Sequence, residues 1–288
     1  MLLVCTALIW SINFIIGKFA YLFEVPPLTL NFLRWALVWL ILFPFTYKEI
    51  FSNIKLIKKN IIYLTILAIT SVSAFNSLVY LALNYTQAID TILMISIIPV
   101  FVLFLSSVLG VEKFNFFQLL GLLVSFVGVL IIFSNADLSK FLNLNFNKGN
   151  AWMLLAVFCW ALYSSLLKKN KLPFSTLGLV EILASIGLIF LIPQFIGEQM
   201  LGKEIKFNKA FFLILTFVTL FASIGAYYSW NKAIELIGPN RASIFLHLMP
   251  VFGVILAIAL LKEKFQMYHF IGVGFIISGI YLSNRKKK

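Results

Sequence analysis

Apolar residues occupy long stretches of this chain, and short polar segments separate them. Ten stretches have about the 20 residues that an α-helix needs to cross a bilayer. They lie at residues 2–21, 28–47, 61–84, 88–109, 117–135, 150–168, 175–196, 209–235, 241–261 and 267–283. Transmembrane β-strands alternate polar and apolar positions, which these stretches do not do. The pattern predicts an all-α integral membrane protein with ten transmembrane helices.

Composition and charge agree with a bilayer environment. Of the 288 residues, 62% are hydrophobic and 11% are charged, whereas a soluble domain has about 25% charged residues. The net charge of +13 is compatible with nucleic-acid binding, but the basic residues gather in short connecting segments, chiefly 48–60, 168–171 and 285–288. Cytoplasmic loops of membrane proteins carry such an excess of Lys and Arg. We therefore expect the lipid bilayer as partner, no nucleic acid, both termini in the cytoplasm and a bacterial inner (plasma) membrane location.

The chain contains a long-range repeat. Residues 97–114 read IIPVFVLFLSSVLGVEKF, and residues 248–265 read LMPVFGVILAIALLKEKF. The two segments share a proline and a closing Glu-Lys-Phe, and the same offset of 151 positions pairs two further glycines in each half. Chance similarity between apolar helices is the alternative, but it does not readily keep these residues in register.

The repeat divides the chain into two halves. The first covers 1–135, a connecting loop covers 136–149, the second covers 150–284, and a basic tail follows at 285–288. Each half has five predicted spans, and because five is odd the second half enters the membrane from the opposite side. Inverted repeats are typical of secondary transporters, which place a substrate site near the bilayer midplane between the halves.

Several spaced residues carry a resemblance to a known family. They are Trp10-Ser11-Ile12-Asn13 with Lys18, Pro27, Arg34, Pro99, Glu112, Gly121 and Gly128 in the first half, and Trp160, Pro250, Glu263, Gly272 and Gly279 in the second. This pattern resembles the EamA-like members of the drug/metabolite transporter superfamily. The resemblance implies a secondary active transporter that moves a small organic metabolite, such as an amino acid, by alternating access. An uptake carrier for a nucleotide-like solute or S-adenosylmethionine stays open.

Polar and aromatic residues recur on one face of four predicted helices, two in each half. Positions i, i+3, i+4 and i+7 share a helix face, and such faces turned inward would form a cavity that holds rings or cations against Trp and Tyr. The predicted cavity residues are Trp10, Asn13, Phe14, Asn76, Tyr80, Trp160, Tyr163, Tyr227, Trp230 and Asn231. The alternative is an aromatic belt at the membrane surface, which the mid-span residues fit less well.

One histidine is a candidate for coupling transport to protons. His247 lies in the middle of a predicted span, three residues before Pro250. Histidine titrates near neutral pH, and ionisable residues inside a membrane commonly serve proton relays. The alternative is a neutral histidine that is hydrogen-bonded to a neighbouring carbonyl.

Four charged residues form a further candidate feature. A charge at the bilayer centre costs about 2.5–3.5 kcal/mol, so it is normally paired. The predicted orientation puts Arg34 and Asp90 in the outer half of the membrane and Glu181 and Arg241 in the inner half. We expect Arg34–Asp90 and Glu181–Arg241 to be ion pairs that open and close the two sides alternately. The alternative is that Asp90 and Arg241 lie in headgroup water.

Other function classes fit the sequence less well. A channel would want a ring of like charges or a carbonyl filter, and an intramembrane enzyme would need a motif such as HExxH or GxSxG; the sequence shows neither. Cys5 and Cys159 have no neighbouring Cys or His, so we expect no metal site and no cofactor. A transporter, and not an enzyme, is the predicted class, with a channel as the remaining alternative.

Overall fold

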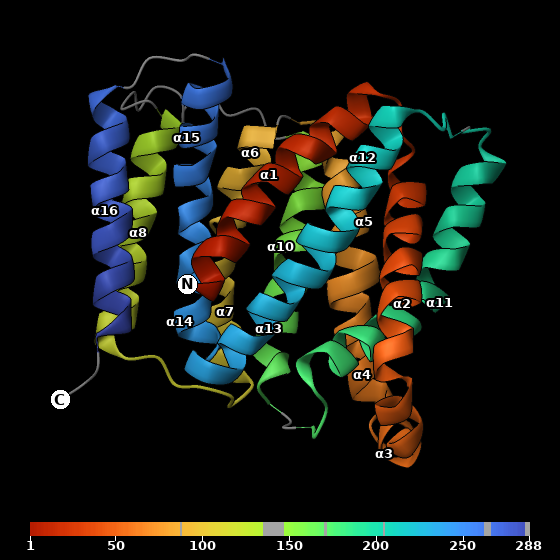
Figure 1. The fold of residues 1–288 in the computed structure, drawn as a ribbon. Helices are drawn as coiled ribbons and strands as arrows, with labels where there is room; N and C mark the ends of the chain where they lie inside the picture. Colours follow the sequence, from red (N-terminus) through yellow and green to blue (C-terminus); the bar gives the residue numbers. More distant parts are fainter. Residues whose placement is uncertain (87, 135–146, 170–171, 204, 262–265, 286–288) are drawn as a thin grey trace.

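The computed structural model describes the chain except for residues 87, 135–146, 170–171, 204, 262–265 and 286–288. The side chains of residues 88–90 and 257–261 also lie outside the description. Nine helical segments of the described part are long and apolar enough to cross a membrane. The tenth predicted span is α16 (Met267–Asn284), which lies alongside the helix that ends the first half (Figure 1). The predicted all-α membrane fold is confirmed.

The first half makes five crossings. Its single helices are α1 (Leu2–Leu22) and α2 (Pro27–Ser52), and the short α3 (Ile54–Lys59) follows them. The third crossing joins α4 (Ile61–Ala68), the π-helical segment η1 (Ile69–Ser73) and α5 (Ala74–Leu83). The fourth joins α6 (Ala88–Ile95) and α7 (Ile98–Val108), and the fifth is α8 (Phe116–Ser134).

The second half repeats this division. It begins with α10 (Lys148–Leu167) and α11 (Thr176–Met200). Its third crossing joins α12 (Lys209–Phe217), the π-helical segment η2 (Val218–Gly225) and α13 (Ala226–Ile237). Its fourth joins α14 (Pro239–Ser243), the 3₁₀ turn η3 (Ile244–His247) and α15 (Leu248–Leu261), and α16 closes it. Both halves therefore carry a π-helical segment in the third crossing and a break just before a proline in the fourth.

The first helices of the two halves run in opposite directions. The side chain of Lys18, near the C-terminal end of α1, donates hydrogen bonds to the carbonyls of Leu83 and Thr86. Gly149, at the start of α10, lies against Ala82 and the same Thr86. Because the end of α1 and the start of α10 meet the same end of α5, the second half is inverted with respect to the first.

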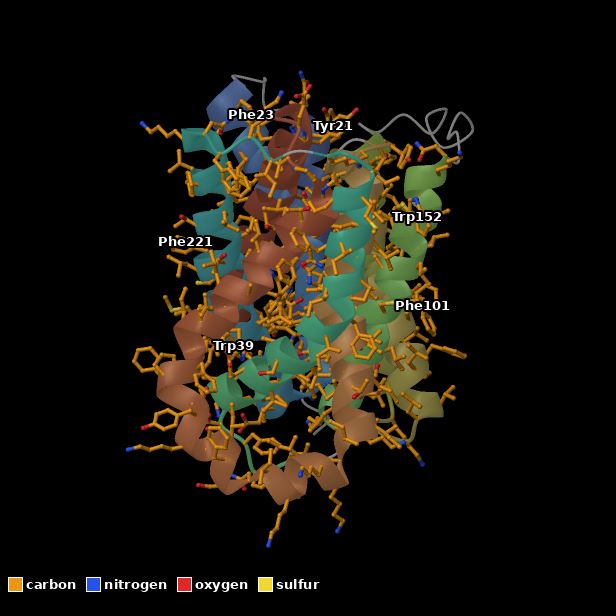
Figure 2. The ribbon with its side chains drawn as sticks, turned by 90° about the vertical axis from the view of Figure 1, so that its right-hand side faces the viewer. Tyr21, Phe23, Trp39, Phe101, Trp152 and Phe221 are labelled. Carbon is orange, nitrogen blue, oxygen red and sulfur yellow. The ribbon has the colours of Figure 1, made fainter. Side chains whose placement is uncertain are left out.

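We name the two ends of the bundle after the predicted orientation. The inner face is where α2 passes into α3, at the bottom of Figure 1, and where α10 leads to α11. The outer face is where α1 leads to α2 and α11 leads to α12. Apolar side chains cover the periphery between the two faces, among them the exposed Phe221, and Tyr21 and Phe23 lie near the outer end (Figure 2). Such a surface fits contact with lipid.

Helices α8 and α16 join the two halves through very close packing. A Cβ atom added at Gly279 would lie 2.4 Å from the carbonyl oxygen of Gly121, and one at Gly128 would lie 2.5 Å from that of Gly272. Small residues allow this approach between membrane helices. The repeat offset converts one of these two contacts into the other, as expected for helices related by a pseudo-two-fold axis.

Helices α2 and α11 form the second junction, and each caps the other. At the inner face the Glu49 carboxylate, near the end of α2, accepts hydrogen bonds from Ser175 N (2.5 Å) and Ser175 Oγ (2.6 Å) at the start of α11. At the outer face the Glu198 carboxylate, near the end of α11, accepts one from Thr29 N (2.6 Å) in the first turn of α2. Carboxylates at helix N-termini satisfy free N–H groups and favour the helix dipole. Two acidic residues thus fasten this helix pair at both membrane faces.

Candidate functional site

A small central cavity lies where the two halves meet. Its volume is about 20 Å³, which leaves room for about one water molecule. Seven of the ten predicted cavity residues line it, namely Trp10, Asn13, Phe14, Asn76, Tyr80, Trp160 and Tyr227. Arg34 lines the same space, although the sequence suggested a place in an ion pair. The structure therefore shows this space closed around polar and aromatic groups from both halves.

Residues that are equivalent in the repeat touch each other here. Asn76 Nδ2 donates to Tyr227 Oη over 2.9 Å, and the two residues are 151 positions apart. His247 Nε2 contacts the carbonyl of Ser96 at 2.9 Å, again over 151 positions. The rings of Trp10 and Trp160 meet edge to face with centroids 5.0 Å apart. A residue can touch its own equivalent only near the pseudo-two-fold axis, so the cavity lies on that axis.

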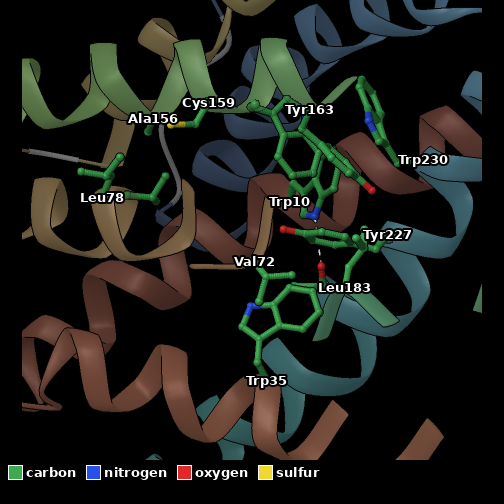
Figure 3. Packing of buried hydrophobic residues seen from close by; sticks show 14 of the residues in the cluster. Trp10, Trp35, Val72, Leu78, Ala156, Cys159, Tyr163, Leu183, Tyr227 and Trp230 are labelled. Atoms are coloured by element: carbon green, nitrogen blue, oxygen red, sulfur yellow. Dashed lines mark hydrogen bonds between the residues drawn. The ribbon is translucent and has the colours of Figure 1, made fainter. Parts of the chain in front are cut away.

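A cluster of large aromatic rings forms one wall of the cavity (Figure 3). Trp10 packs against Trp230 and Tyr227 with centroid distances of 5.4 and 6.2 Å. Trp160 packs against Tyr163 at 5.2 Å and against Tyr227 at 5.3 Å. Tilted and edge-to-face pairs of this kind stabilise an interior beyond their buried area. The cluster is buried almost completely, so the rings close the cavity on this side.

The two π-helical segments supply backbone carbonyls to this cluster. A π-helical turn shifts the backbone hydrogen-bond pattern from i+4 to i+5 and is frequent at functional sites. The carbonyl of Ser71 in η1 accepts hydrogen bonds from Tyr227 Oη (2.7 Å) and Asn76 Nδ2 (2.8 Å). The carbonyl of Ala222 in η2 accepts one from Trp10 Nε1 (3.2 Å), drawn as the dashed line in Figure 3. Ser71 and Ala222 are 151 positions apart, so each π segment is bonded at the equivalent carbonyl by a ring of the opposite half.

Arg34 is buried beside the cavity and is held by neutral groups. Its Nη1 donates to Asn76 Oδ1 (2.9 Å) and Tyr80 Oη (3.0 Å), and its Nε donates to Ser223 Oγ. The side chain is 1% exposed. Within the described part of the chain, no carboxylate oxygen lies within 4.0 Å of the guanidinium. The positive charge is thus hydrogen-bonded but not balanced by these neighbours.

The other three predicted cavity residues lie just beyond the aromatic wall. Tyr163 Oη donates to Asn231 Oδ1 over 2.7 Å, and Trp230 Nε1 donates to Ser164 Oγ over 3.3 Å. Asn231 lines a separate pocket of about 430 Å³, together with Tyr63, Lys168 and other residues at the inner face. Tyr163, Trp230 and Asn231 therefore lie between the central cavity and this inner vestibule.

A second vestibule opens at the outer face. Its volume is about 390 Å³, and Tyr21, Glu24, Asn84, Lys203 and Lys206 are among its lining residues. Lys206 donates a hydrogen bond to the Glu24 carboxylate, and this lysine lowers the pKa of Glu24 below its usual value. The inner vestibule has the corresponding composition of lysines and one glutamate, Lys168, Lys232 and Glu235. Asn84 and Glu235 are equivalent in the repeat, so the two vestibules are related by the pseudo-two-fold axis.

His247 is buried and bonded on both ring nitrogens. Nε2 lies 2.9 Å from the Ser96 carbonyl, so it donates there, and Nδ1 lies 2.7 Å from Ser125 Oγ on α8. The Ser96 carbonyl is available because Val100 N, its partner in a continuous α-helix, bonds the Ile97 carbonyl instead, and Pro99 has no N–H to donate. Ser125 Oγ also lies 3.0 Å from the carbonyl of Leu122. Its single proton goes either to that carbonyl or to Nδ1, so the geometry accommodates both a charged and a neutral imidazole.

One of the two predicted ion pairs is absent from the structure, and the other lies partly outside the described residues. The side chain of Asp90 lies outside the described residues, so Arg34–Asp90 stays a prediction. Glu181 and Arg241 are described and form no ion pair with each other. Both carboxylate oxygens of Glu181 and Nε of Arg241 have no hydrogen-bond partner in the part of the chain that the structure describes. The expected Glu181–Arg241 pair is wrong for the present conformation, because the sequence placed both residues at a similar membrane depth but did not fix the helix face that each occupies. The internal prolines of α2 and α11, Pro44 and Pro193, are 149 positions apart, so the equivalent of Arg34 is Leu183, two positions from Glu181.

Sequence reasoning did not find several residues that shape the site. Ser71 acts through the π-helical segment η1, which no periodicity of apolar residues reveals. Glu49 and Glu198 were available as acidic residues at equivalent ends of two predicted spans. The internal prolines of those spans, Pro44 and Pro193, have the same separation in sequence as the two glutamates and were the signal that could have paired Glu49 with Glu198. Glu112 of the repeated Glu-Lys-Phe motif binds Asn240 N (3.3 Å) at the start of α14, a contact between halves that the motif itself does not show.

The sequence is similar to those of membrane transporters, and the fold is similar to that of a solved structure. Residues 1–134 and 147–285 each match the EamA-like transporter family. An uncharacterized transporter of Archaeoglobus fulgidus is 30% identical over 290 residues, which cover all of this chain and 97% of that protein. The uncharacterized transporter YyaM of Bacillus subtilis is 26% identical over 78% of this chain and 73% of its own length. A solved crystal structure superposes with a TM-score of 0.68 at 13% identity and covers 97% of this chain and 96% of its own, a likeness of fold.

Proposed function

Because the chain belongs to the EamA-like transporter family, and is therefore a membrane transporter and not an enzyme, we propose that it is a secondary active carrier working by alternating access. Its solute would be a small organic metabolite, an amino acid or a similar compound, bound in the central cavity. Family membership confirms the resemblance read from the sequence. The proposal adds the mechanism, the class of solute and the site.

One observation carries the mechanism. The central cavity lies on the pseudo-two-fold axis, and an aromatic wall separates it from the inner vestibule. The axis relates that vestibule to the outer one, so a rearrangement that exchanges the conformations of the two halves would exchange access between the faces. A continuous pore is not needed for such transport. A cavity of about 20 Å³ fits a closed intermediate of this cycle better than it fits a channel.

Proton coupling is part of the proposal. His247 joins three elements, because it lies on η3 and contacts Ser96 of the fourth crossing and Ser125 of α8. A change in its protonation state would change which group donates at Ser125, and so the docking of the α8–α16 pair on the bundle. We further propose a bacterial inner membrane location with both termini in the cytoplasm; the distribution of basic residues supports the orientation.

Counterflow in proteoliposomes tests the carrier. Vesicles loaded with one unlabelled amino acid or nucleotide at a time receive a trace of the same labelled compound outside. A carrier accumulates the label transiently above equilibrium and saturates with concentration, whereas a channel only equilibrates it. The same screen with and without a pH gradient tests coupling. Equilibration without overshoot for a solute that does cross would favour the channel.

A further inference from the structure

We infer that the central cavity binds an anionic group of its solute, a carboxylate or a group of similar shape, at Arg34. This inference rests on the proposed function as a carrier and narrows the class of solute. Four features of the described residues carry it: an unbalanced charge, unused donors, an unused acceptor and the shape of the surrounding wall.

The charge comes first. Arg34 is 1% exposed and lies in a membrane-spanning helix, yet its hydrogen-bond partners are a serine, an amide and a phenol. These groups are uncharged. Charged groups inside a membrane normally pair with an opposite charge or face a polar cavity. Within the described part of the chain, which excludes the side chain of Asp90, Arg34 has the cavity and not a counter-ion. An anionic group of the solute in that cavity would supply an opposite charge.

Only some of the N–H donors of Arg34 are used by its protein neighbours. A guanidinium has five N–H donors in a planar fork. Nε and Nη1 are bonded to Ser223, Asn76 and Tyr80. Among the described residues Nη2 has no hydrogen-bond partner, so its two N–H groups stay free. Arg34 is held in place by three neighbours and still has donors for an anion, which is the arrangement a carboxylate or phosphate-like group needs.

The unused hydrogen-bond acceptor is the side-chain oxygen of Asn13, which lines the same cavity as Arg34. Asn13 is 7% exposed, and its Oδ1 has no hydrogen-bond partner among the described residues. A buried acceptor without a donor is costly, so a ligand N–H or O–H group would be favoured there. Apart from Asn76, the rest of the wall is apolar or aromatic and includes Phe14, Trp10 and Trp160. The cavity therefore suits a small organic anion with a hydrogen-bond donor and an apolar part.

The present volume shows how binding would be linked to the transport cycle. About 20 Å³ is too small for an organic anion, so the wall must open before the solute enters. Removal of the charge would then reduce affinity for the anion without removing the cavity. A conservative Arg34→Lys change would keep the charge but lose the fork that Asn76, Tyr80 and Ser223 hold.

Benzoate and benzamide are the probes that test this, because they have nearly the same shape and differ in charge. Titration of the purified full-length protein in detergent is followed by tryptophan fluorescence, since Trp10 and Trp160 line the cavity. We expect wild type to bind benzoate at least about tenfold more tightly than benzamide, as charge-assisted hydrogen bonds imply. Arg34→Gln should abolish the preference, and Arg34→Lys should retain part of it.

Lys18→Gln is the matched control, because Lys18 is a part-buried cation that bonds the Leu83 and Thr86 carbonyls and is absent from the cavity lining among the described residues. It should keep the wild-type preference. Equal affinity for the two probes in wild type, or no response to either, would overturn the inference without any variant. A folded Arg34→Gln protein that still prefers benzoate would overturn it as well.

The counterflow screen separates this inference from the proposed function. A neutral solute that wild type and Arg34→Gln carry equally well would leave the carrier intact and overturn the anion site. A preserved benzoate preference that depends on Arg34, without counterflow of any solute, would support the anion site and overturn the carrier.

Discussion

The reciprocal caps of α2 and α11 allow a quantitative prediction about stability. Glu198→Gln removes one negative charge at the outer face and keeps the size of the side chain. The carboxylate is 3% exposed, accepts a 2.6 Å hydrogen bond from Thr29 N, and lies 3.6 Å from Lys203 Nζ. A glutamine oxygen can still accept from Thr29, so the change measures the charge and not the contact.

The loss can be estimated term by term. A hydrogen bond to a charged group contributes about 1.5–3 kcal/mol and a neutral one about 0.5–1.5. The charge near the first turn of α2 adds about 0.3–1 kcal/mol, and the half-exposed ion pair with Lys203 adds about 0–1. The free energy of unfolding should therefore fall by about 2 kcal/mol. At roughly 2–4 °C per kcal/mol, Tm in detergent should fall by about 4–8 °C.

The inner cap supplies the internal comparison. Ser175 is exposed, so water competes for the Glu49 carboxylate, and Glu49→Gln should lower Tm by less than half as much. Glu235→Gln is the control, because that exposed carboxylate pairs with Lys232 on its own helix, and its Tm should stay within about 1 °C of wild type. The measurement is a thermal melt of tryptophan fluorescence. If Glu198→Gln melts like wild type, or Glu49→Gln is the more damaging change, the caps do not fasten the helix pair as argued.

Three further changes have definite expected outcomes. Gly279→Ala should lower Tm clearly, because its Cβ would lie 2.4 Å from the Gly121 carbonyl, whereas Gly274→Ala on the same helix has nothing within 4 Å and should not; equal melts would contradict the close packing. His247→Gln should flatten the pH dependence of counterflow in a protein that still folds, and an unchanged profile would remove His247 from coupling. Trp10→Phe keeps a ring but loses the bond to Ala222, so it should change the rate of transport more than the affinity; a pure change in affinity would assign Trp10 to solute binding alone.

The fold was predictable because its determinants are local and repeated. Long apolar runs are required wherever a helix crosses lipid, since every backbone group must be satisfied within the segment. The repeated proline and glycines then placed the two halves, because Gly121 and Gly128 meet Gly279 and Gly272 in the structure. Sequence periodicity also brought Trp10, Asn76 and Tyr227 to one space. The prediction succeeded there because polar residues inside a membrane span normally face the interior of the bundle and not the lipid.

The site was less predictable where it depends on small changes of register. Hydropathy does not fix the register of the repeat to the residue, and a slip of two positions, the separation of Glu181 from Leu183, turns a helix face by about half a turn. The π-helical segments add a residue to a turn and so change the helix face on which the following side chains lie. Neither the shift of register nor the π-helical turns change the hydropathy pattern of the sequence. Both carboxylate oxygens of Glu181 on α11 are buried and have no hydrogen-bond partner among the described residues, a feature that the sequence did not predict.

The pseudo-symmetry also shows what the opposite conformation requires. In this structure Trp10 Nε1 bonds the Ala222 carbonyl, whereas its equivalent, Trp160, makes no such bond to Ser71, whose carbonyl accepts from Tyr227 and Asn76 instead. Exchanging the conformations of the halves would release Trp10 and bond Trp160 to Ser71. The two π segments would then serve as hinges that alternate, since the tryptophan of the other half bonds each of them in only one of the two states. The aromatic wall would move from the inner to the outer side of the cavity, and the solute would change sides with no pore between the vestibules.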